Sequence, residues 1–376
     1  MDILNKKIGI IGGGQLGKMM ILEAKRLGFY CITLDPTLNC PSHSLSDEHI
    51  VSAFDDIEKI EELAEKSDII TYEIEHISVE ALKNIERKGH IVYPSVSSLE
   101  IIQDKYLQKK KLQDNEILVP AFFKVEYIEQ IIDVPVMLKA TKGGYDGRGN
   151  FLIKDKKDIE KGFKVLGGKD LIAEEVIPFI KEISVIACRT INGKRKIYPV
   201  AENIHKENIL DTTIVPARIS DGVAEKAKKI ADKVMDIFDG VGTFCIEMFV
   251  TSDNKIYVNE VAPRPHNSGH YTIEGCFVNQ FENHIRAIMG LSLGSTDLRA
   301  PTVMKNILGE SKGKTRVVGL AEALENQNVR VHIYGKANSN VKRKMGHLTA
   351  IGETLGEALE SAENAKKKIS ILGEEK

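Results

Sequence analysis

Two glutamates that face each other across a predicted hairpin are the best candidates for chemistry in this sequence. The strand-like runs GTFCIEMFV and KIYVNEVAP flank the segment TSDNK, whose Asp253 and Asn254 are residue types that favour a tight turn. A turn centred between these two residues places Glu247 directly opposite Glu260. Like charges in that arrangement destabilise a sheet unless a cation offsets them. Mg²⁺ is commonly held by one or two carboxylates and substrate phosphates, so the pair predicts a magnesium site.

The alternative for this pair is two solvated carboxylates on an exposed strand face. The residues around them are apolar, which disfavours that alternative: Phe244, Ile246, Phe249 and Val258.

The glycine-rich segment KATKGGYDGRGN offers a second chemical feature. Its four glycines permit close backbone approach to a ligand, and Lys139, Lys142 and Arg148 supply positive charge for a phosphate. Lys139 ends the apolar run PVMLK, so we expect a strand to aim its ammonium group. A plain turn is the alternative, but Tyr145, Asp146 and Arg148 crowd into the same loop.

The segment AEEVIPFIKEISV has the features of a nucleotide-base contact. Its EEVI run ends at Pro178, which predicts an extended connection whose backbone N–H and C=O groups suit an adenine edge. Glu182 suits ribose hydroxyls. The alternative is an acidic strand end that faces solvent.

The segment VNEVAPRPHNSGHYTIEGC gathers Arg264, His266 and Asn267 in a loop interrupted by prolines and glycine. A rigid loop of this kind beside a metal is typical of an anion-binding site. His270 lies four residues after His266, but Gly269 and the prolines argue against a helix that would align the two rings. We therefore expect no zinc site built on this histidine pair.

The N-terminal run KIGIIGGGQLGKMM points to another function. Gly12, Gly14 and Gly17 have the G-x-G-x-x-G spacing of a dinucleotide-binding loop, and Asp35 follows at the distance of a ribose-binding carboxylate. Taken alone, this run predicts an oxidoreductase that binds a nicotinamide or flavin dinucleotide. A second mononucleotide-binding half does not follow it, because residues 120–180 have the character of a lid.

The elements that must position these residues change character along the chain. Apolar strands alternate with helical stretches to about Pro94, including a strand HIVYP, which predicts a parallel sheet covered by helices on both faces. One helix follows from Ser95 to Leu112, in which Lys109–Lys111 read as a solvated face. Shorter strands then predict a small α+β lid, and paired runs predict an antiparallel sheet.

These patterns predict a multidomain fold of the α/β and α+β classes. We expect a Rossmann-like domain at residues 1–98 and a second domain at residues 99–300, whose lid spans about 119–180. A small β-rich C-terminal domain, ending in an amphipathic helix, covers residues 301–376.

Overall composition excludes several classes of protein. The 52 basic and 54 acidic residues leave a net charge of −2, which argues against nucleic acid or a membrane surface as the main partner. Five scattered cysteines without a C-x-x-C pair argue against a disulfide framework or a structural zinc site. We expect free thiols, and the N-terminus has no signal-like run, so we expect a cytoplasmic protein.

Taken together, the motifs resemble those of the ATP-grasp superfamily, and within it the family of 5-(carboxyamino)imidazole ribonucleotide synthetases of purine biosynthesis. The resemblance covers nearly the whole chain and rests on seven motifs in this order: GGGQLGKM, TYEIEH, KATKGGYDGRGN, EEVIPFIKEISV, AENIHKENI, NEVAPRPHNSGHYTIEGC and KRKMGH. It implies an ATP-grasp fold with an N-terminal Rossmann-like (pre-ATP-grasp) domain. It also implies that the loop Gly12–Gly17 offers N–H groups to the phosphoribosyl group of an acceptor.

The resemblance implies a role for each matching residue. ATP contacts fall on Lys105, Lys139, Gly144, Tyr145, Asp146, Gly147, Arg148, Gly149, Asn150, Glu174, Glu175, Val176, Ile177, Glu182, His205, Asn259 and Glu260. Acceptor contacts fall on Gln15, Leu16, Glu73, Tyr145, Asp146, Arg148, Lys336, Arg343 and Lys344. Catalytic roles fall on Lys139, Arg148, Arg264, His266 and Asn267. The metal ligands are Glu247 and Glu260, and Ala262 replaces an asparagine ligand of related carboxylases, which leaves water or Asn267 as substitutes.

The implied reaction is the carboxylation of 5-aminoimidazole ribonucleotide with ATP and bicarbonate, through carboxyphosphate, with Mg²⁺ or Mn²⁺ as the cation. The resemblance further implies a homodimer. Another ATP-grasp ligase, such as a formate-dependent glycinamide ribonucleotide transformylase, is the nearest alternative function, and a dinucleotide-dependent oxidoreductase is a distant one. A nucleotide-sensing protein without catalysis is disfavoured because the metal carboxylates and the phosphate lysines are all present.

Overall fold

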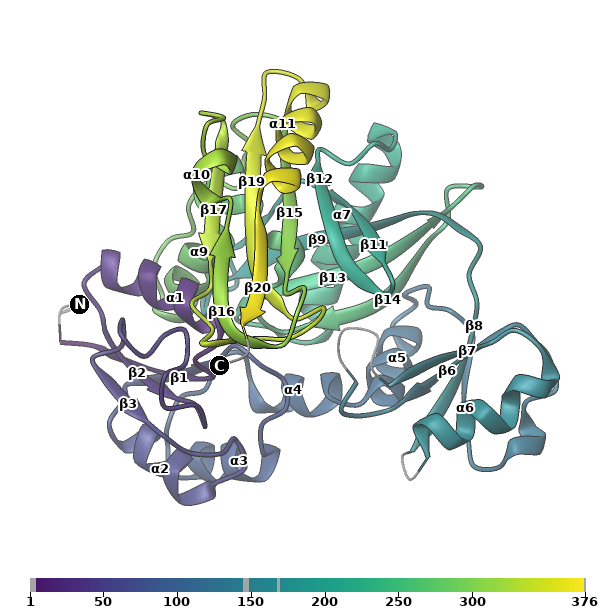
Figure 1. The fold of residues 1–376 in the computed structure, drawn as a ribbon. Coiled ribbons are helices and arrows are strands. Elements are labelled where there is room, and N and C mark those ends of the chain that lie inside the picture. The colour runs from purple at the N-terminus through teal and green to yellow at the C-terminus, as the bar shows by residue number, and fades with distance from the viewer. Residues whose placement is uncertain (1–4, 145–148, 168–169, 375–376) are drawn as a thin grey trace.

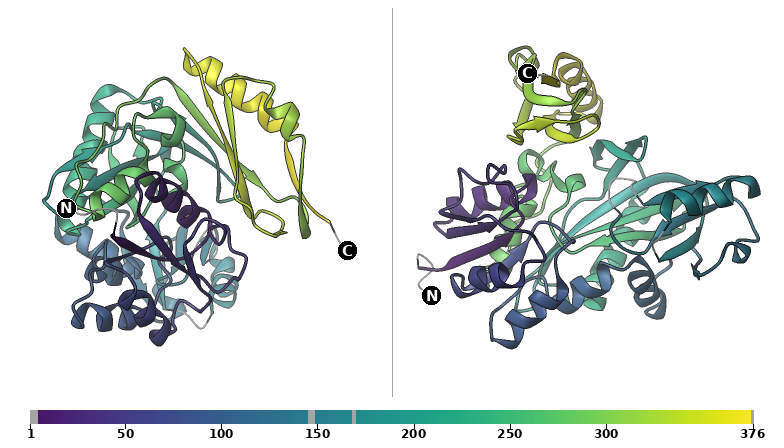
Figure 2. Two further views of the ribbon diagram at one scale, coloured as in Figure 1. Left: turned by 90° about the vertical axis from the view of Figure 1, so that its left-hand side faces the viewer. Right: turned by 60° about the horizontal axis from the view of Figure 1, so that its bottom comes forward.

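The structure is a computed structural model that describes residues 5–144, 149–167 and 170–374. A parallel sheet lies near the N-terminus, a long antiparallel sheet forms the centre, and a small antiparallel sheet forms most of the lid (Figure 1). A further small sheet lies near the C-terminus. Figure 2 shows the N-terminal sheet, the lid and the C-terminal segment at three corners around the central sheet.

The N-terminal sheet has the strand order β3-β2-β1-β4, and all its strands are parallel. Its face with Ile11 and Leu34 packs on α2 and α3, whereas the face with Ile8 and Ile10 packs on α1 and on α9 of the central domain. Helices on both faces confirm the α/β prediction for this part of the chain. The bounds are β1 (Lys7–Ile11), α1 (Gln15–Arg26), β2 (Tyr30–Leu34), β3 (Glu48–Ile50), α2 (Ile57–Glu65), β4 (Ile69–Tyr72) and α3 (Val79–Arg87).

Two local predictions in this region are wrong. The run HIVYP makes only an isolated bridge between Val92 and Ile70, and the chain bends at Tyr93 and Pro94 directly after it. The single helix expected from Ser95 to Leu112 is two helices, α4 (Val96–Ile102) and α5 (Lys105–Asp114). Asp104 begins the second helix, since its carboxylate accepts hydrogen bonds from the N–H groups of Tyr106 and Leu107.

The lid is a four-stranded antiparallel sheet with the order β5-β8-β6-β7, and α6 covers one face. Its apolar core includes Leu138, Ile153 and Ala173, which confirms the expected α+β lid. The bounds are β5 (Phe122–Val125), β6 (Val136–Ala140), β7 (Asn150–Ile153), α6 (Ile159–Leu166) and β8 (Leu171–Glu175), with short 3-10 turns at Ile128–Gln130 and Lys156–Asp158.

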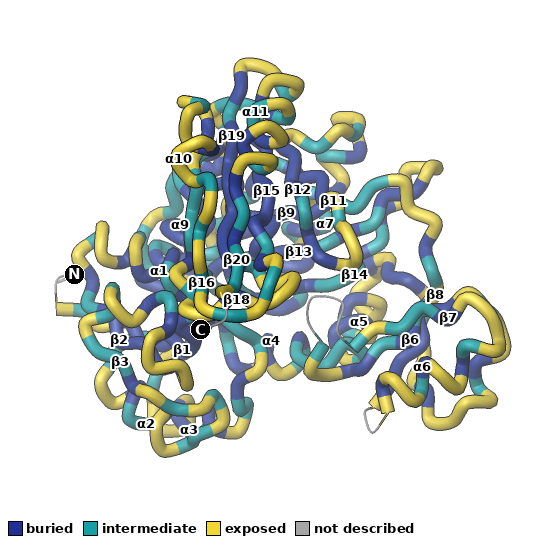
Figure 3. Tube along the Cα trace, viewed as in Figure 1, coloured by how far each residue is buried: buried dark blue, intermediate teal, exposed yellow. Residues whose placement is uncertain are grey.

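The central sheet follows the path β14-β13-β9-β11-β12-β15-β19-β17, with β10 beside β9, and every pairing in it is antiparallel. Its strands are mostly buried, whereas the outer loops of the lid are exposed (Figure 3). One face packs against α7, whose Val223, Ala227 and Ala231 recur at helical spacing. The opposite face of β13 points towards the loop that follows β14.

The bounds in this region are β9 (Phe179–Arg189), β10 (Arg195–Ile197), β11 (Ala201–Lys206), β12 (Ile209–Val215), α7 (Asp221–Ile237), β13 (Gly242–Thr251) and β14 (Ile256–Ala262). A 3-10 turn at Asn267–Gly269 leads into α8 (Thr272–Gly275) and α9 (Gln280–Ile288).

The C-terminal segment is built onto the central sheet. Strands β15, β19 and β17 continue that sheet beyond β12, so hydrogen bonds cross the expected boundary at residue 300. Its bounds are β15 (Thr302–Leu308), β16 (Gly313–Val318), α10 (Leu320–Ala323), β17 (Val329–Ile333), β18 (Asn338–Ser339), β19 (Lys344–Ile351), α11 (Leu355–Lys368) and β20 (Ser370–Glu374). Among the described residues, no helix has the length and apolar character needed to cross a membrane.

Candidate active site

A cavity of about 1100 Å³ lies where the N-terminal sheet, α5, the lid and the central sheet meet. Most of the site residues that the sequence analysis predicted line this one cavity. They are Gln15, Leu16, Glu73, Lys105, Lys139, Gly144, Asn150, Glu174, Glu175, Val176, Ile177, Glu182, His205, Glu247, Asn259, Glu260, Arg264, His266, Asn267 and Lys344. Residues up to 329 positions apart in the chain, from Gln15 to Lys344, therefore converge on a single space.

Some nominated residues are not among those that line the cavity. Gly149, Lys336 and Arg343 are outside its lining. Lys336 Nζ donates to the carbonyl of Lys344 at 2.7 Å, and Arg343 donates to the carbonyl of Asn338 at 2.7 Å. The nominated residues Tyr145, Asp146, Gly147 and Arg148 lie outside the described residues.

The cross-strand pair of glutamates is confirmed, but the turn alone does not produce it. Glu247 pairs with Glu260, whereas nearer the turn Met248 pairs with Val258, so one residue of β14 is extra. That residue is Asn259, which forms a β-bulge. The predicted register ignores this bulge and is wrong by one residue between Met248 and the turn.

The bulge determines which side chains of β14 face the cavity. Val258 and Val261 both pack in the core beneath α7, although they are three positions apart in a strand. The two residues between them, Asn259 and Glu260, both line the cavity. A regular strand would turn one of them into the core, so the extra residue gives the site two polar side chains instead of one.

Three lysines surround these groups from α5 and the lid. Lys105, at the first position of α5, lies with its Nζ 2.8 Å from Glu260 Oε2. Lys139, at the end of β6, lies with its Nζ 2.7 Å from Glu174 Oε2 and 3.4 Å from Asn259 Oδ1. The predicted strand placement of Lys139 is confirmed.

The third lysine, Lys109, corrects the sequence analysis. Its side chain is only 2% exposed, so it does not belong to a solvated face. Its Nζ lies 3.3 Å from Glu174 Oε1 and donates to the carbonyl of Asn259 at 3.1 Å. The signal was present in the sequence, because Lys105 and Lys109 are four residues apart and share one face of a helix.

The pKa directions show how charge is distributed among these groups. Burial, together with the neighbouring Glu182, raises the pKa of Glu247 to about 7. Burial would also raise the pKa of Glu260, but Lys105 outweighs it and the pKa is lowered. Burial lowers the pKa of Lys109 to about 8, although Glu174 partly offsets it. Glu247 is therefore the carboxylate whose charge is least compensated, as expected of a cation ligand.

A second polar pair lies next to Glu247. His205 Nδ1 lies 2.8 Å from Glu182 Oε2, and this interaction outweighs burial and raises the pKa of His205. Both residues are on neighbouring strands, β11 and β9, and both line the cavity.

The loop after β14 brings charge from the other side. Arg264 Nη2 lies 2.9 Å from Glu75 Oε1, which the sequence analysis did not nominate. Asn267 exchanges hydrogen bonds with Asn306, at 3.0 Å and 2.7 Å. The amide of Asn267 is thus engaged in a side-chain pair, and Ala262 offers no donor atom beyond the backbone. We therefore favour water over Asn267 as a further metal ligand.

The glycine loop does not offer its glycine N–H groups to a phosphate. The carboxylate of Glu73 accepts hydrogen bonds from the N–H groups of Gly14 and Gly17, the latter at 2.6 Å. Asp35 accepts from the N–H of Gly13 at 2.8 Å. A protein carboxylate thus occupies the anion position, which corrects the expected role of the loop and removes the basis for a bound dinucleotide.

An apolar wall of the cavity was largely missed from the sequence. Phe179 and Phe249 stack with ring centroids 4.6 Å apart, and Met137, Leu152 and Pro120 also line the cavity. Alternating strand patterns gave no signal for this wall, because its members come from the lid, from the segment before it and from two strands of the central sheet. Such a wall next to Glu175, Val176 and Ile177 fits a planar base.

Comparisons with known proteins give a consistent result. Residues 5–103 match the ribonucleotide synthetase preATP-grasp domain, residues 110–281 the ATP-grasp domain, and residues 302–361 the phosphoribosylaminoimidazole carboxylase C-terminal domain. The N5-carboxyaminoimidazole ribonucleotide synthase of Bacillus subtilis is 41% identical, over 95% of this chain and 94% of that protein. The chain spans about two thirds (67%) of the length of the phosphoribosylaminoimidazole carboxylase of Ogataea methanolica, at 40% identity.

Solved structures agree. The N5-carboxyaminoimidazole ribonucleotide synthetase of Thermotoga maritima has a TM-score of 0.90 and 46% identity, and the match covers 98% of this chain and 100% of that one. The Aspergillus clavatus N5-carboxyaminoimidazole synthase, solved with ADP and 5-aminoimidazole ribonucleotide, has a TM-score of 0.88 and 33% identity, over 97% of this chain and 98% of that one.

Proposed function

The chain belongs to the ATP-grasp family of N5-carboxyaminoimidazole ribonucleotide synthases, and we propose that its central cavity carries out the reaction of that family. It is an ATP-dependent ligase of purine biosynthesis that forms N5-carboxyaminoimidazole ribonucleotide from 5-aminoimidazole ribonucleotide. The observation that carries the assignment of the cavity is the paired Glu247 and Glu260, because they bring two carboxylates and the lysine of α5 to one wall.

The nucleotide half of the cavity lies between the lid and the central sheet. We propose that the adenine base occupies the apolar wall with Phe179 and Phe249, where the backbone of Glu175–Ile177 reads its edge. Glu182 then accepts the ribose hydroxyls, and Lys105 and Lys139 contact the phosphates. In the described structure both lysines pair with carboxylates, so phosphate binding exchanges one anionic partner for another.

Glu247 and Glu260 fit a divalent cation. Two carboxylates held opposite each other, one with its pKa raised to about 7, need a positive partner to remain ionised together. We propose that they hold Mg²⁺, or Mn²⁺, which supplies neutralisation of charge on the phosphate oxygens. The rest of the charge is supplied by Lys105 and Lys139.

The acceptor half lies towards the N-terminal sheet. Gln15, Leu16, Glu73 and Lys344 line this end of the cavity. Because Glu73 occupies the glycine N–H groups, we propose that Gln15 and Leu16 contact the acceptor through groups that lie beyond the glycines. Lys344 is the basic residue of the C-terminal segment that reaches the cavity, and we propose that it meets the acceptor phosphate, with Lys336 and Arg343 nearby.

The proposed chemistry has two steps. An oxygen of bicarbonate attacks the γ-phosphorus as the bond to ADP breaks, which gives carboxyphosphate. The exocyclic amine of the acceptor then forms a bond to the carboxyl carbon, phosphate leaves, and the amine proton passes to phosphate. Catalysis of the first step consists mainly of positioning and charge neutralisation. We propose that Arg264, which Glu75 orients, holds the bicarbonate, with His266 beside it.

Carboxyphosphate reacts readily with water, so the site must exclude it during the reaction. We propose, on the family resemblance alone, that the glycine-rich segment 144–150 contacts the phosphates and that Arg148 acts on the reacting groups; residues 145–148 lie outside the described residues. We also propose, on the family resemblance alone, a homodimer in the cytoplasm; the five free, buried cysteines are compatible with a reducing compartment.

ADP release by the purified protein tests the proposed function. With MgATP and bicarbonate, we expect ADP formation that depends on 5-aminoimidazole ribonucleotide and falls when bicarbonate is stripped from the buffer. ADP formation that ignores this acceptor, or that requires formate, would reassign the cavity to another ATP-grasp ligase.

A further inference from the structure

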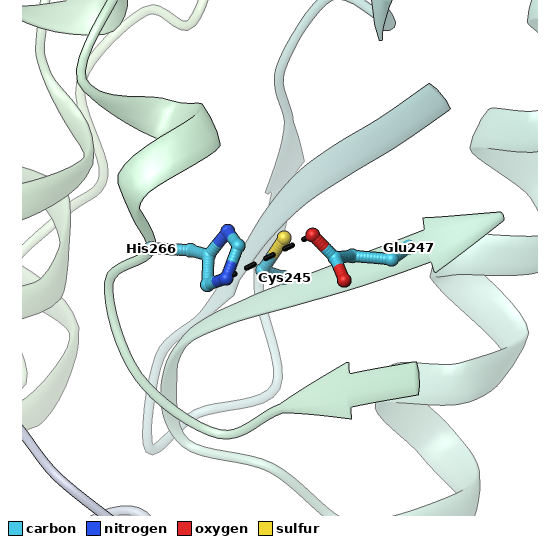
Figure 4. Close-up of side chains that lie close together, drawn as sticks. All are labelled: Cys245, Glu247 and His266. Atoms are coloured by element: carbon cyan, nitrogen blue, oxygen red, sulfur yellow. Dashed lines mark ion pairs between the residues drawn. The ribbon is translucent and has the colours of Figure 1, made fainter. Parts of the chain in front are cut away.

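Cys245, Glu247 and His266 bring a sulfur, an oxygen and a nitrogen donor together (Figure 4). Glu247 and His266 line the cavity, whereas Cys245 is fully buried next to them. Their ligand atoms all lie within 4.8 Å of one another, and His266 Nε2 is 3.8 Å from Glu247 Oε1. Within the part of the chain that the structure describes, no other group of three such residues comes this close. Cys245 has no role in the reaction proposed above.

The fold explains why these side chains meet. Cys245 and Glu247 are two residues apart on β13, so both point to the same face of the sheet. His266 comes from the loop after β14, which folds back over that face. The three side chains converge without any rearrangement of the strands.

Ser268 holds two of the three donors in place. Its hydroxyl lies 2.9 Å from His266 Nδ1 and 3.5 Å from Cys245 Sγ, and Ser184 donates a hydrogen bond to it at 2.9 Å. The backbone N–H of Ser268 donates to Nδ1 at 3.3 Å, so Nε2 carries the proton of the neutral ring and faces Glu247. An ion bound at Nε2 requires the other tautomer, in which Nδ1 gives up this bond and donates to the Ser268 hydroxyl. An outer partner of this kind is what usually orients a metal-binding histidine.

These three donors favour a different ion than the pair of glutamates does. Magnesium prefers oxygen ligands, whereas a thiolate, an imidazole and a carboxylate are typical of zinc and of similar divalent ions. For tetrahedral zinc, with bonds of about 2.0–2.3 Å, the donors must approach one another by roughly 1 Å. Glu247 and His266 line the open cavity, so rotation of their side chains can supply that approach.

We propose that Cys245, Glu247 and His266 form a binding site for a thiophilic divalent ion such as Zn²⁺, and that it shares Glu247 with the Mg²⁺ pair. The thiol proton leaves to solvent when the ion binds, and water completes the coordination. An ion bound here withdraws Glu247 from Glu260, so it inhibits ATP turnover. The inhibition rests on the proposed function, whereas binding of the ion does not.

Cobalt(II) spectroscopy tests the site without relying on turnover. The full-length protein, in thiol-free buffer, is titrated with Co²⁺ as wild type, Cys245→Ala and Cys245→Ser. Cys31→Ala is the matched control, because Cys31 is an equally buried free cysteine in the N-terminal sheet. We expect the near-ultraviolet thiolate-to-cobalt band in wild type and in Cys31→Ala, its loss in both Cys245 variants, and its displacement by Zn²⁺. A band that survives in the Cys245 variants, or no band in wild type, would overturn the site.

Inhibition of ADP formation tests the shared ligand. Loss of a partner outside the coordination sphere typically weakens a metal site about 10- to 100-fold, so loss of the thiolate ligand itself should raise the Zn²⁺ concentration for half-inhibition at least about tenfold. Cys31→Ala should match wild type. Equal inhibition of wild type and Cys245→Ala would show that zinc acts elsewhere. If the protein forms no ADP at all, the proposed function fails, and the cobalt band still decides whether the ion binds.

Discussion

At the scale of single residues, the site combines two kinds of glutamate. Glu260 is paired with Lys105 and keeps a lowered pKa, whereas burial raises the pKa of Glu247 to about 7. A site of this kind is poised for a cation, because added positive charge removes the main electrostatic cost of ionising the second carboxylate.

Replacement of Glu260 by glutamine should therefore abolish most of the activity and leave the fold intact. The amide keeps the shape of the side chain but loses the charge that holds Lys105 and the proposed cation. We expect ADP formation to fall by roughly 100-fold or more, a magnitude typical of the loss of one electrostatic contact to a transition state. Turnover is measured with saturating MgATP, bicarbonate and 5-aminoimidazole ribonucleotide. Glu225→Gln, on the exposed face of α7, is the control. Unchanged turnover in Glu260→Gln would contradict the proposed metal site.

Lys109 is a buried residue whose charge supports the site through Glu174. Lys109→Met leaves Glu174 with Lys139 as its remaining ion-pair partner in the described structure, and it removes a donor to the carbonyl of Asn259. Breaking a buried pair typically costs about 3–5 kcal/mol. We expect a loss of that order in the free energy of unfolding, and a higher KM for ATP because Lys139 is held more tightly by Glu174.

The neighbouring Lys110 provides the matched control for this experiment. It is exposed and pairs with Asp114 on the same helix, so Lys110→Met should change stability by less than about 0.5 kcal/mol. Urea unfolding and ATP kinetics are measured on both variants. Equal effects of the two substitutions would show that burial of Lys109 has no energetic consequence.

At the scale of elements, the site depends on where α5 begins. Asp104 accepts hydrogen bonds from the N–H groups of Tyr106 and Leu107, and this cap sets Lys105 at the first helical position. Asp104→Ala should destabilise the protein by about 1 kcal/mol. Because the first turn then frays, we also expect a several-fold rise in KM for ATP.

A second helix cap allows the loss of stability to be separated from the rise in KM for ATP. Asp56 caps α2 by accepting from the N–H of Lys59, and α2 has no residue in the lining of the cavity. Asp56→Ala should cost a similar amount of stability, measured by urea unfolding, and leave KM for ATP unchanged. If both variants raise KM equally, the effect is one of general stability and not of the position of Lys105.

The same elements show what the sequence was able to predict. Strand periodicity and a turn signal were sufficient to pair β13 with β14 and to bring Glu247 opposite Glu260. The bulge at Asn259 was not predicted, because it follows from packing of Val258 and Val261 beneath α7 and not from any local pattern. The break before α5 had a signal, an aspartate at Asp104, that a run of helix-favouring residues obscured.

Long-range contacts account for the remaining errors. Lys109 is buried against Glu174, which is 65 positions away in the chain. The N–H groups of the glycine loop donate to the carboxylate of Glu73, which is 59 positions from Gly14. Neither partner can be identified from periodicity, because both contacts form only when the lid and the N-terminal sheet have folded. The motifs predicted residues that line one cavity, and their ionic partners were identified from the fold.

At the scale of the whole molecule, buried histidines lie at the junctions between the sheets and between a loop and the central sheet. His284 bridges the N-terminal and central sheets, with its Nε2 2.8 Å from Thr71 Oγ1 and its Nδ1 accepting from the N–H of Thr243 at 3.1 Å. His270 lies against His347, with ring centroids 4.6 Å apart, where the loop after β14 meets β19. Each of these rings is fully buried at a junction.

Burial keeps these three histidines neutral and makes the molecule sensitive to acid. It lowers the pKa of His284 to about 3, and it lowers the pKa values of His270 and His347 well below the usual value. Below about pH 6.5 the unfolded chain therefore binds protons that the folded chain does not, so stability falls as the pH falls. Each such histidine contributes a slope of up to about 1.4 kcal/mol per pH unit.

Each buried imidazole binds one proton on unfolding in acid, so removing one imidazole should reduce the slope of stability against pH. We expect His347→Gln to lower the stability at pH 8 but to lose less stability than wild type between pH 6.5 and pH 5, by up to about 1.4 kcal/mol per unit. Tyr334→Phe removes the hydroxyl that lies 3.1 Å from His347 Nδ1 but keeps the imidazole, so it should retain the wild-type slope. Urea unfolding at several pH values measures both. If His347→Gln keeps the full wild-type slope, the imidazole of His347 binds a proton in the folded protein as well, and the acid sensitivity comes from other groups.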